Sequence, residues 1–67
     1  MKPQLVEKVV SLINEELKNC SDDVYPTLCR MKATSMGLKK IHAMTLKIIT
    51  ETGMSVGSAL AQLESSL

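Results

Sequence analysis

Two cysteines, one histidine and a pair of aspartates are the side chains of this chain best suited to hold a metal or to attack a substrate. They are Cys20, Cys29, His42, Asp22 and Asp23. Eight residues separate the cysteines, whereas zinc sites use close pairs such as C-x2-C together with further ligands. The spacing therefore favours Cys29 as a small core residue and Cys20 as a reduced thiol in a linker. We expect neither a metal nor a cofactor.

Catalysis has little support in the sequence. His42 lies at the edge of an apolar helical face, which is typical of a packing histidine. A Cys–His nucleophile pair needs a third group to orient the histidine, and no such group is indicated. A glycine-rich phosphate loop and a G-x-S-x-G element are both absent from the 67 residues. We therefore expect that the protein is not an enzyme.

Basic residues are concentrated in the middle of the chain. Residues 26–50 carry a charge of +5 without any acid, whereas residues 1–25 and 51–67 each carry −2, for a total of +1. Such a segment suits an acidic protein face or a phosphate backbone, although a solvated surface is the simpler explanation. Methionines gather in the same region and either adapt to a partner or fill gaps in the core. The candidate partner-binding residues are Arg30, Lys32, Lys39, Lys40, Lys47, Met36 and Met44.

The C-terminal half of the chain has the outline of a helix-turn-helix. The pattern predicts a helix over Leu38–Thr52, which Gly53 ends and which Ser55, as an N-cap, separates from a second helix over about 56–66. The run around this turn resembles the turn of a DNA-binding helix-turn-helix. However, Ile49 stands where such motifs usually carry a small residue.

The second of these two predicted helices offers little that reads DNA. Residues 54–67 contain no Lys or Arg and one acid, Glu64, whereas a recognition helix presents basic or amide groups to phosphates and base edges. Gln62 also occupies a late position at which such motifs need an apolar residue. A helical hairpin that packs on its neighbours is therefore favoured over a DNA-reading element.

Hydrophobic periodicity predicts two further helices in the first half of the chain. The first covers about Pro3–Asn19, and its apolar residues span roughly 160° of the helical wheel. This arc is wider than one neighbouring helix needs. A second helix is predicted over about Tyr25–Ser35, with a break at 34–37 in which Ser35 or Gly37 serves as a cap. The arc of the first helix consists of Leu5, Val6, Val9, Val10, Leu12, Ile13 and Leu17.

Length and composition indicate a small domain that associates with itself. A chain of 67 residues buries only about 60% of the surface that its unfolded form exposes. The core lacks Trp and Phe and has one Tyr, although 45% of the residues are hydrophobic. Burial against a second copy would compensate for this small core.

Neither a signal peptide nor a membrane-spanning stretch is recognisable, because charges interrupt the opening segment and no apolar run is long enough. We therefore expect a cytoplasmic protein. The predicted fold is all-α: a single helical domain over residues 1–67, built as a small bundle of three to four short helices, and dimeric.

The favoured function is a small protein-interaction module, either a regulator or an adaptor, that acts as a homodimer. The alternative is a small DNA-binding transcriptional regulator that uses a helix-turn-helix at about residues 38–66. In that case Lys39, Lys40 and Lys47 would contact phosphates.

Overall fold

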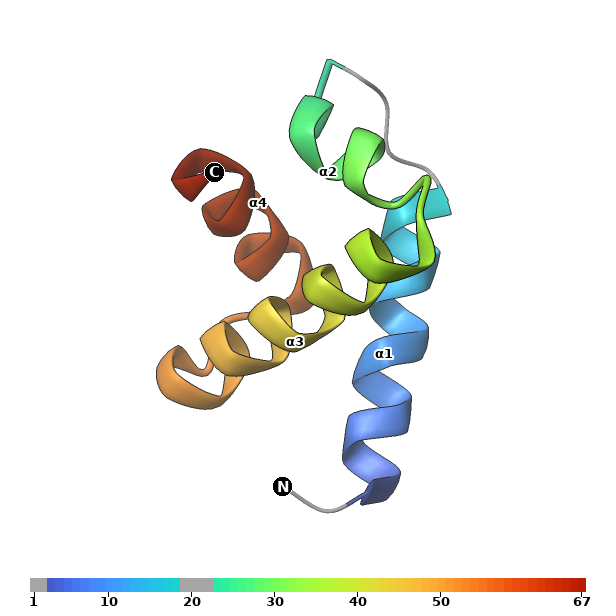
Figure 1. The fold of residues 1–67 in the computed structure, drawn as a ribbon. Coiled ribbons are helices and arrows are strands. Elements are labelled where there is room, and N and C mark those ends of the chain that lie inside the picture. The colour runs from blue at the N-terminus through green and yellow to red at the C-terminus, as the bar shows by residue number, and fades with distance from the viewer. Residues whose placement is uncertain (1–2, 19–22) are drawn as a thin grey trace.

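The computed structural model describes residues 3–18 and 23–67 of the chain, and within these ranges it consists of four helices without any strand. Figure 1 shows their arrangement. The elements are α1 (Pro3–Lys18), α2 (Pro26–Met31), α3 (Ser35–Thr52) and α4 (Val56–Ser66). The prediction of a small all-α bundle is confirmed. The linker predicted after α1 falls largely on residues 19–22, outside the described residues.

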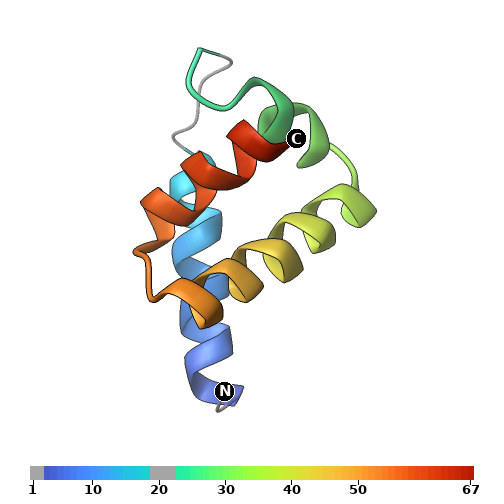
Figure 2. The ribbon, with the colours of Figure 1, turned by 90° about the vertical axis from the view of Figure 1, so that its left-hand side faces the viewer.

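The helices pack so that α3 and α4 form a hairpin and α1 crosses both of them (Figure 2). The short helix α2 packs against α3 and α4, beside the C-terminal end of α4 (Figure 2). Each helix therefore has one face in a shared interior. This interior has an aliphatic core, which consists of Ile13, Leu17, Leu28, Ile41, Leu60 and Leu63.

The turn between α3 and α4 is built as the sequence predicts. Gly53 adopts the left-handed conformation, with φ of 74°, and its N–H donates to the carbonyl oxygen of Ile49 at 2.8 Å. The Ser55 hydroxyl accepts from the N–H of Ser58 at 3.3 Å. Glycine avoids the steric cost of this backbone conformation, and the serine satisfies a free N–H at the start of α4. The predicted end of α3 and start of α4 are confirmed.

The predicted boundary between the second and third helices is wrong. α2 ends at Met31, and α3 begins at Ser35 and runs through Gly37. The cap is Thr34, whose hydroxyl oxygen accepts from the N–H of Gly37 at 3.0 Å. Gly37 does not break a helix here, because its role is close approach: a Cβ at this position would collide with the carbonyl oxygen of Met31.

One buried hydroxyl departs from the otherwise apolar interior. Thr45 is fully buried in the middle of α3, and its Oγ1 atom has no hydrogen-bond partner among residues 3–18 and 23–67. A buried polar group without a partner loses its hydration and gains nothing in return. The buried hydroxyl of Thr45 therefore lowers the stability of the fold.

Replacing Gly37 by alanine should destabilise the protein by about 2 kcal/mol, because the new methyl group must displace the backbone at Met31. Gly57→Ala is the matched control, since a Cβ at Gly57 meets no atom within 4 Å and alanine favours a helix. Urea denaturation of both variants measures the difference. Equal stabilities would contradict the proposed close approach of α2 and α3.

Replacing Thr45 by valine should raise the free energy of unfolding by about 1 kcal/mol, because valine keeps the shape and removes the unpaired hydroxyl. The exposed Thr50→Val change on the same helix is the control and should stay within about 0.5 kcal/mol of the wild type. Thermal and urea unfolding provide the measurement. A destabilised Thr45→Val protein would show that the hydroxyl has a partner.

Candidate functional site

An open groove of about 580 Å³ lies between α1 and the turn that joins α3 to α4. Glu15 and Glu16 line it on α1, and Gly57 lines it at the start of α4. Nothing lies within 4 Å of the position that a Cβ would take at Gly57, so the groove is open there. The apolar lining consists of Val9, Leu12, Ile49, Met54 and Val56. The groove is thus mainly apolar, with two carboxylates on one side.

Apolar surface continues from this groove along α1. Leu5 and Leu12 have exposed fractions of 51% and 46%, whereas Ile13 is fully buried. Consecutive helical positions are about 100° apart, so a helix that points Ile13 into the core turns Leu12 away from it. Leu12 follows Leu5 by seven positions, about two helical turns, which places both on the same side of α1. We call this pair the α1 flank.

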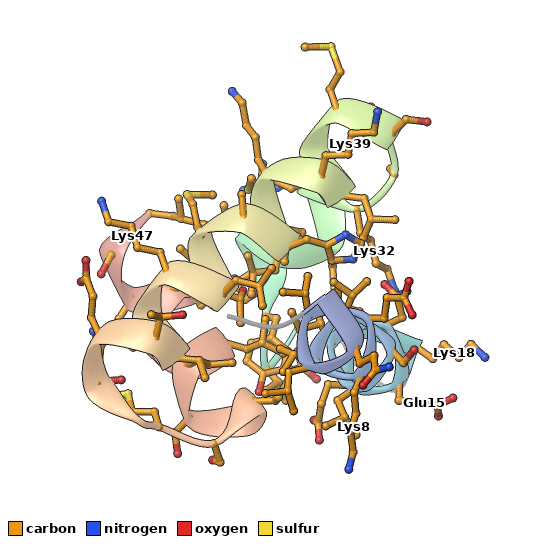
Figure 3. The ribbon with its side chains drawn as sticks, turned by 90° about the horizontal axis from the view of Figure 1, so that it is seen from below. Lys8, Glu15, Lys18, Lys32, Lys39 and Lys47 are labelled. Atoms are coloured by element: carbon orange, nitrogen blue, oxygen red, sulfur yellow. The ribbon has the colours of Figure 1, made fainter. Side chains whose placement is uncertain are left out.

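Charged residues border the α1 flank on the outside of the molecule. Lys8 lies one turn before Leu12 and Glu15 one turn after it. Figure 3 shows Lys8, Glu15 and Lys18 on the side of α1 that faces away from α3. The Nζ atom of Lys18 lies 3.8 Å from Oε1 of Glu15, and both side chains are largely exposed, so this ion pair contributes little stability.

A second surface runs along the outer side of α3. Its residues follow one another at spacings of four and three, and all of them are exposed; Met36 reaches an exposed fraction of 74%. Lys39 is exposed beside this row, and Figure 3 shows Lys39 and Lys47 extending from α3 on the opposite side of the molecule from Lys8. We call the row the α3 seam. It consists of Met36, Lys40, Ala43, Lys47 and Thr50.

The remaining residues predicted to bind a partner lie elsewhere. Lys32 donates from Nζ to the carbonyl oxygen of Leu17 at 2.6 Å, which satisfies a free carbonyl in the last turn of α1. Arg30 lies on α2, where its charge acts on Glu64. Met44 is half-buried against the aliphatic core. The seven predicted residues therefore do not form one patch, and four of them lie on or beside the α3 seam.

Glu64 has a structural role that the sequence did not indicate. Its Oε1 atom accepts from the N–H groups of Thr27 and Leu28, both at 3.0 Å. These groups begin α2, whose N-cap residue Tyr25 provides no side-chain cap. Desolvation raises the pKa of Glu64, but hydrogen bonds from Leu28 and Thr27 and the charge of Arg30 outweigh it, so the pKa is lowered. The α4 carboxylate thus caps α2.

His42 joins α3 to α1. Its Nε2 atom donates to Oδ1 of Asn14 at 2.8 Å, and partial burial lowers the pKa of the ring. Cys29 is half-buried on α2. Throughout residues 3–18 and 23–67, no three His, Cys, Asp or Glu side chains are grouped so as to hold a metal ion. In the same ranges, none of the helices combines the length and apolar character that crossing a bilayer requires.

Comparisons with protein-family models, with curated proteins and with solved structures found no match to this chain. The structure is a small all-α bundle with an apolar surface, made of the α1 flank and the groove, and a basic surface, the α3 seam.

The cap that Glu64 provides makes stability depend on pH. Because the pKa of Glu64 is lower in the folded protein than the ordinary value of 4.5, its contribution is complete above pH 4.5 and is lost as the pH falls below it. A Glu64→Gln variant should be less stable at neutral pH and should lose less stability on acidification. Urea midpoints across this range test the expectation, with the exposed Glu51→Gln as control. Parallel profiles for wild type and Glu64→Gln would count against the cap.

Proposed function

We propose that the protein is a small protein-interaction module that acts as a homodimer, in which the α1 flank of each copy packs on the groove side of the other. The observation that carries this proposal is the half-exposure of Leu5 and Leu12, at 51% and 46%, next to an apolar groove. Covering this surface removes large aliphatic side chains from water, which is the main driving force of association.

The size of the chain supports self-association. The aliphatic core is small and contains no Trp or Phe, and chains of this length often gain stability from a second copy. An interface that includes Val9, Leu12 and Val56 extends this core, because Val9 and Val56 already pack against it. The dimer interface therefore extends the aliphatic core of each copy.

The charges around the α1 flank are complementary to themselves. Lys8 precedes Leu12 by one turn and Glu15 follows it by one turn. When two α1 helices pack antiparallel around a two-fold axis near Leu12, Lys8 of each copy faces the partner's Glu15. This pairing occurs twice and closes the assembly at two copies. It fixes the orientation of the dimer more than it adds affinity.

DNA binding has less support than protein binding. The exposed residues of α4 include Ser58, Ala61 and Gln62, but α4 has no Lys or Arg. The exposed lysines of the hairpin all lie on α3. A helix that enters the major groove needs side chains that reach phosphates and base edges. The helix-turn-helix outline therefore serves packing in this proposal.

Replacing Leu12 by glutamate should dissociate the dimer, raising Kd by about a hundredfold or more, because a charge would enter an apolar interface. Val24→Glu is the matched control, since Val24 is 60% exposed and lies outside the groove. Light scattering over a dilution series gives the mass of each protein. A wild-type protein that is monomeric at every concentration would refute the dimer.

A second variant separates interface from fold. Gly57→Gln places a side chain in the open groove without changing the charge, and it replaces glycine by a better helix former. We expect an unchanged or higher melting temperature together with weaker dimerisation. A dimer that tolerates Gly57→Gln would show that the groove takes no part in the interface.

A further inference from the structure

The α3 seam is a helical interaction surface with a regular repeat. Its five positions, from Met36 to Thr50, alternate spacings of four and three residues, which is the heptad spacing by which one helix packs along another. At 1.5 Å per residue, the seam extends over about 21 Å. The core-facing residues Ile41, Thr45 and Ile48 lie on the opposite side of α3. The fold therefore leaves the seam uncovered.

The lysines of the seam have no partners in the part of the chain that the structure describes. Lys40 and Lys47 form no hydrogen bond or ion pair with any of the described residues. Residues 26–50 contain no acid, and Glu51 is the one acidic residue of α3. Moreover, Glu51 lies in the last turn, where the helix dipole disfavours an anion, and no acid occupies the first turn. The charges of α3 are thus not arranged to stabilise α3 itself.

The side chains between these lysines suit a helical partner. Ala43 lies at the centre of the seam, where its small side chain lets another helix approach closely. Met36, with an exposed fraction of 74%, offers a flexible apolar contact at one end. A partner helix that places apolar residues along Met36 and Ala43 and carboxylates beside Lys40 and Lys47 would match both features.

We propose that the α3 seam binds an acidic amphipathic helix of another protein. The proposal rests on the protein being an interaction module, but it uses a different face from the dimer interface. A dimer displays one seam on each subunit, so it presents two equivalent sites to its partners. An acidic helix is favoured over nucleic acid, because Met36 and Ala43 between the lysines are apolar and donate no side-chain hydrogen bond to phosphates.

The test uses a synthetic acidic peptide of about three heptads, with leucines at the core positions and glutamates beside them. Fluorescence anisotropy of the labelled peptide should show saturable binding to the wild-type protein. The Lys40→Glu/Lys47→Glu double variant should bind at least about tenfold more weakly. Circular dichroism should show that this variant remains folded, because both lysines are exposed. Lys47→Glu alone is compared with Lys18→Glu, a reversal of equal charge on α1, which should leave binding unchanged.

Two further variants distinguish peptide binding at the seam from non-specific attraction of charges and from effects of dimerisation. Ala43→Gln keeps the net charge and obstructs the centre of the seam, so it should also weaken binding. Leu12→Glu should leave the affinity of each subunit for the peptide unchanged even when the dimer is lost. A wrong dimer proposal and a wrong seam proposal therefore give different results.

The proposal is overturned if the peptide does not bind, or if Lys18→Glu weakens binding as much as Lys47→Glu does. It is also overturned if Ala43→Gln binds as well as the wild type. Duplex DNA is titrated in parallel. Binding of DNA that the seam lysines control, in place of peptide binding, would assign the surface to nucleic acid.

Discussion

The aliphatic cluster shared by all four helices is the interaction on which the rest of the structure depends. Ile13 and Leu17 reach it from α1, and the other helices contribute Leu28, Ile41, Leu60 and Leu63. Most of the stability of a helix in a protein comes from the packing of its apolar face, so each of the four helices depends on this common interior. The interior is too small to bury all the apolar side chains of the four helices. Because α1 is apolar over a wide arc, burying Ile13 leaves Leu5 and Leu12 partly in water.

Polar side chains from one helix complete the ends of another where the cluster does not reach. The Glu64 carboxylate on α4 caps α2, and the Lys32 ammonium group, just after α2, binds the last turn of α1. His42 and Asn14 join the sides of α3 and α1. These links explain why the lysines of the basic segment 26–50 have different roles. Lys32 and Glu64 bind the ends of helices, whereas Lys40 and Lys47 form no such bond with any described residue.

Much of this architecture could be predicted from the sequence, because periodicity and capping act over a few residues. The extents of α1 and α4 follow from apolar spacing, and Gly53 and Ser55 mark the end of α3 and the turn to α4. The region around Gly37 could not be predicted, because a glycine that permits two backbones to approach closely looks the same in sequence as one that ends a helix.

The candidate functional site was only partly predictable from the sequence. The wide apolar arc of α1 indicated a surface without a partner in the chain, but the groove combines residues from both ends of the sequence. Likewise, the orientation of α2 and α3 decides which basic residues lie on the α3 seam and which bind within the fold.

The bond between Lys32 and the Leu17 carbonyl has a consequence for the topology of the chain. It joins Lys32, just after α2, to Leu17 in the last turn of α1, so this contact closes a loop between two positions that lie 15 residues apart in the sequence. The entropic cost of closing such a loop grows only with the logarithm of its length. Residues added to the sequence between Lys18 and Pro26 should therefore cost little folding free energy and leave the packing of the four helices intact, whereas the left-handed conformation of Gly53 fixes the geometry of the turn between α3 and α4.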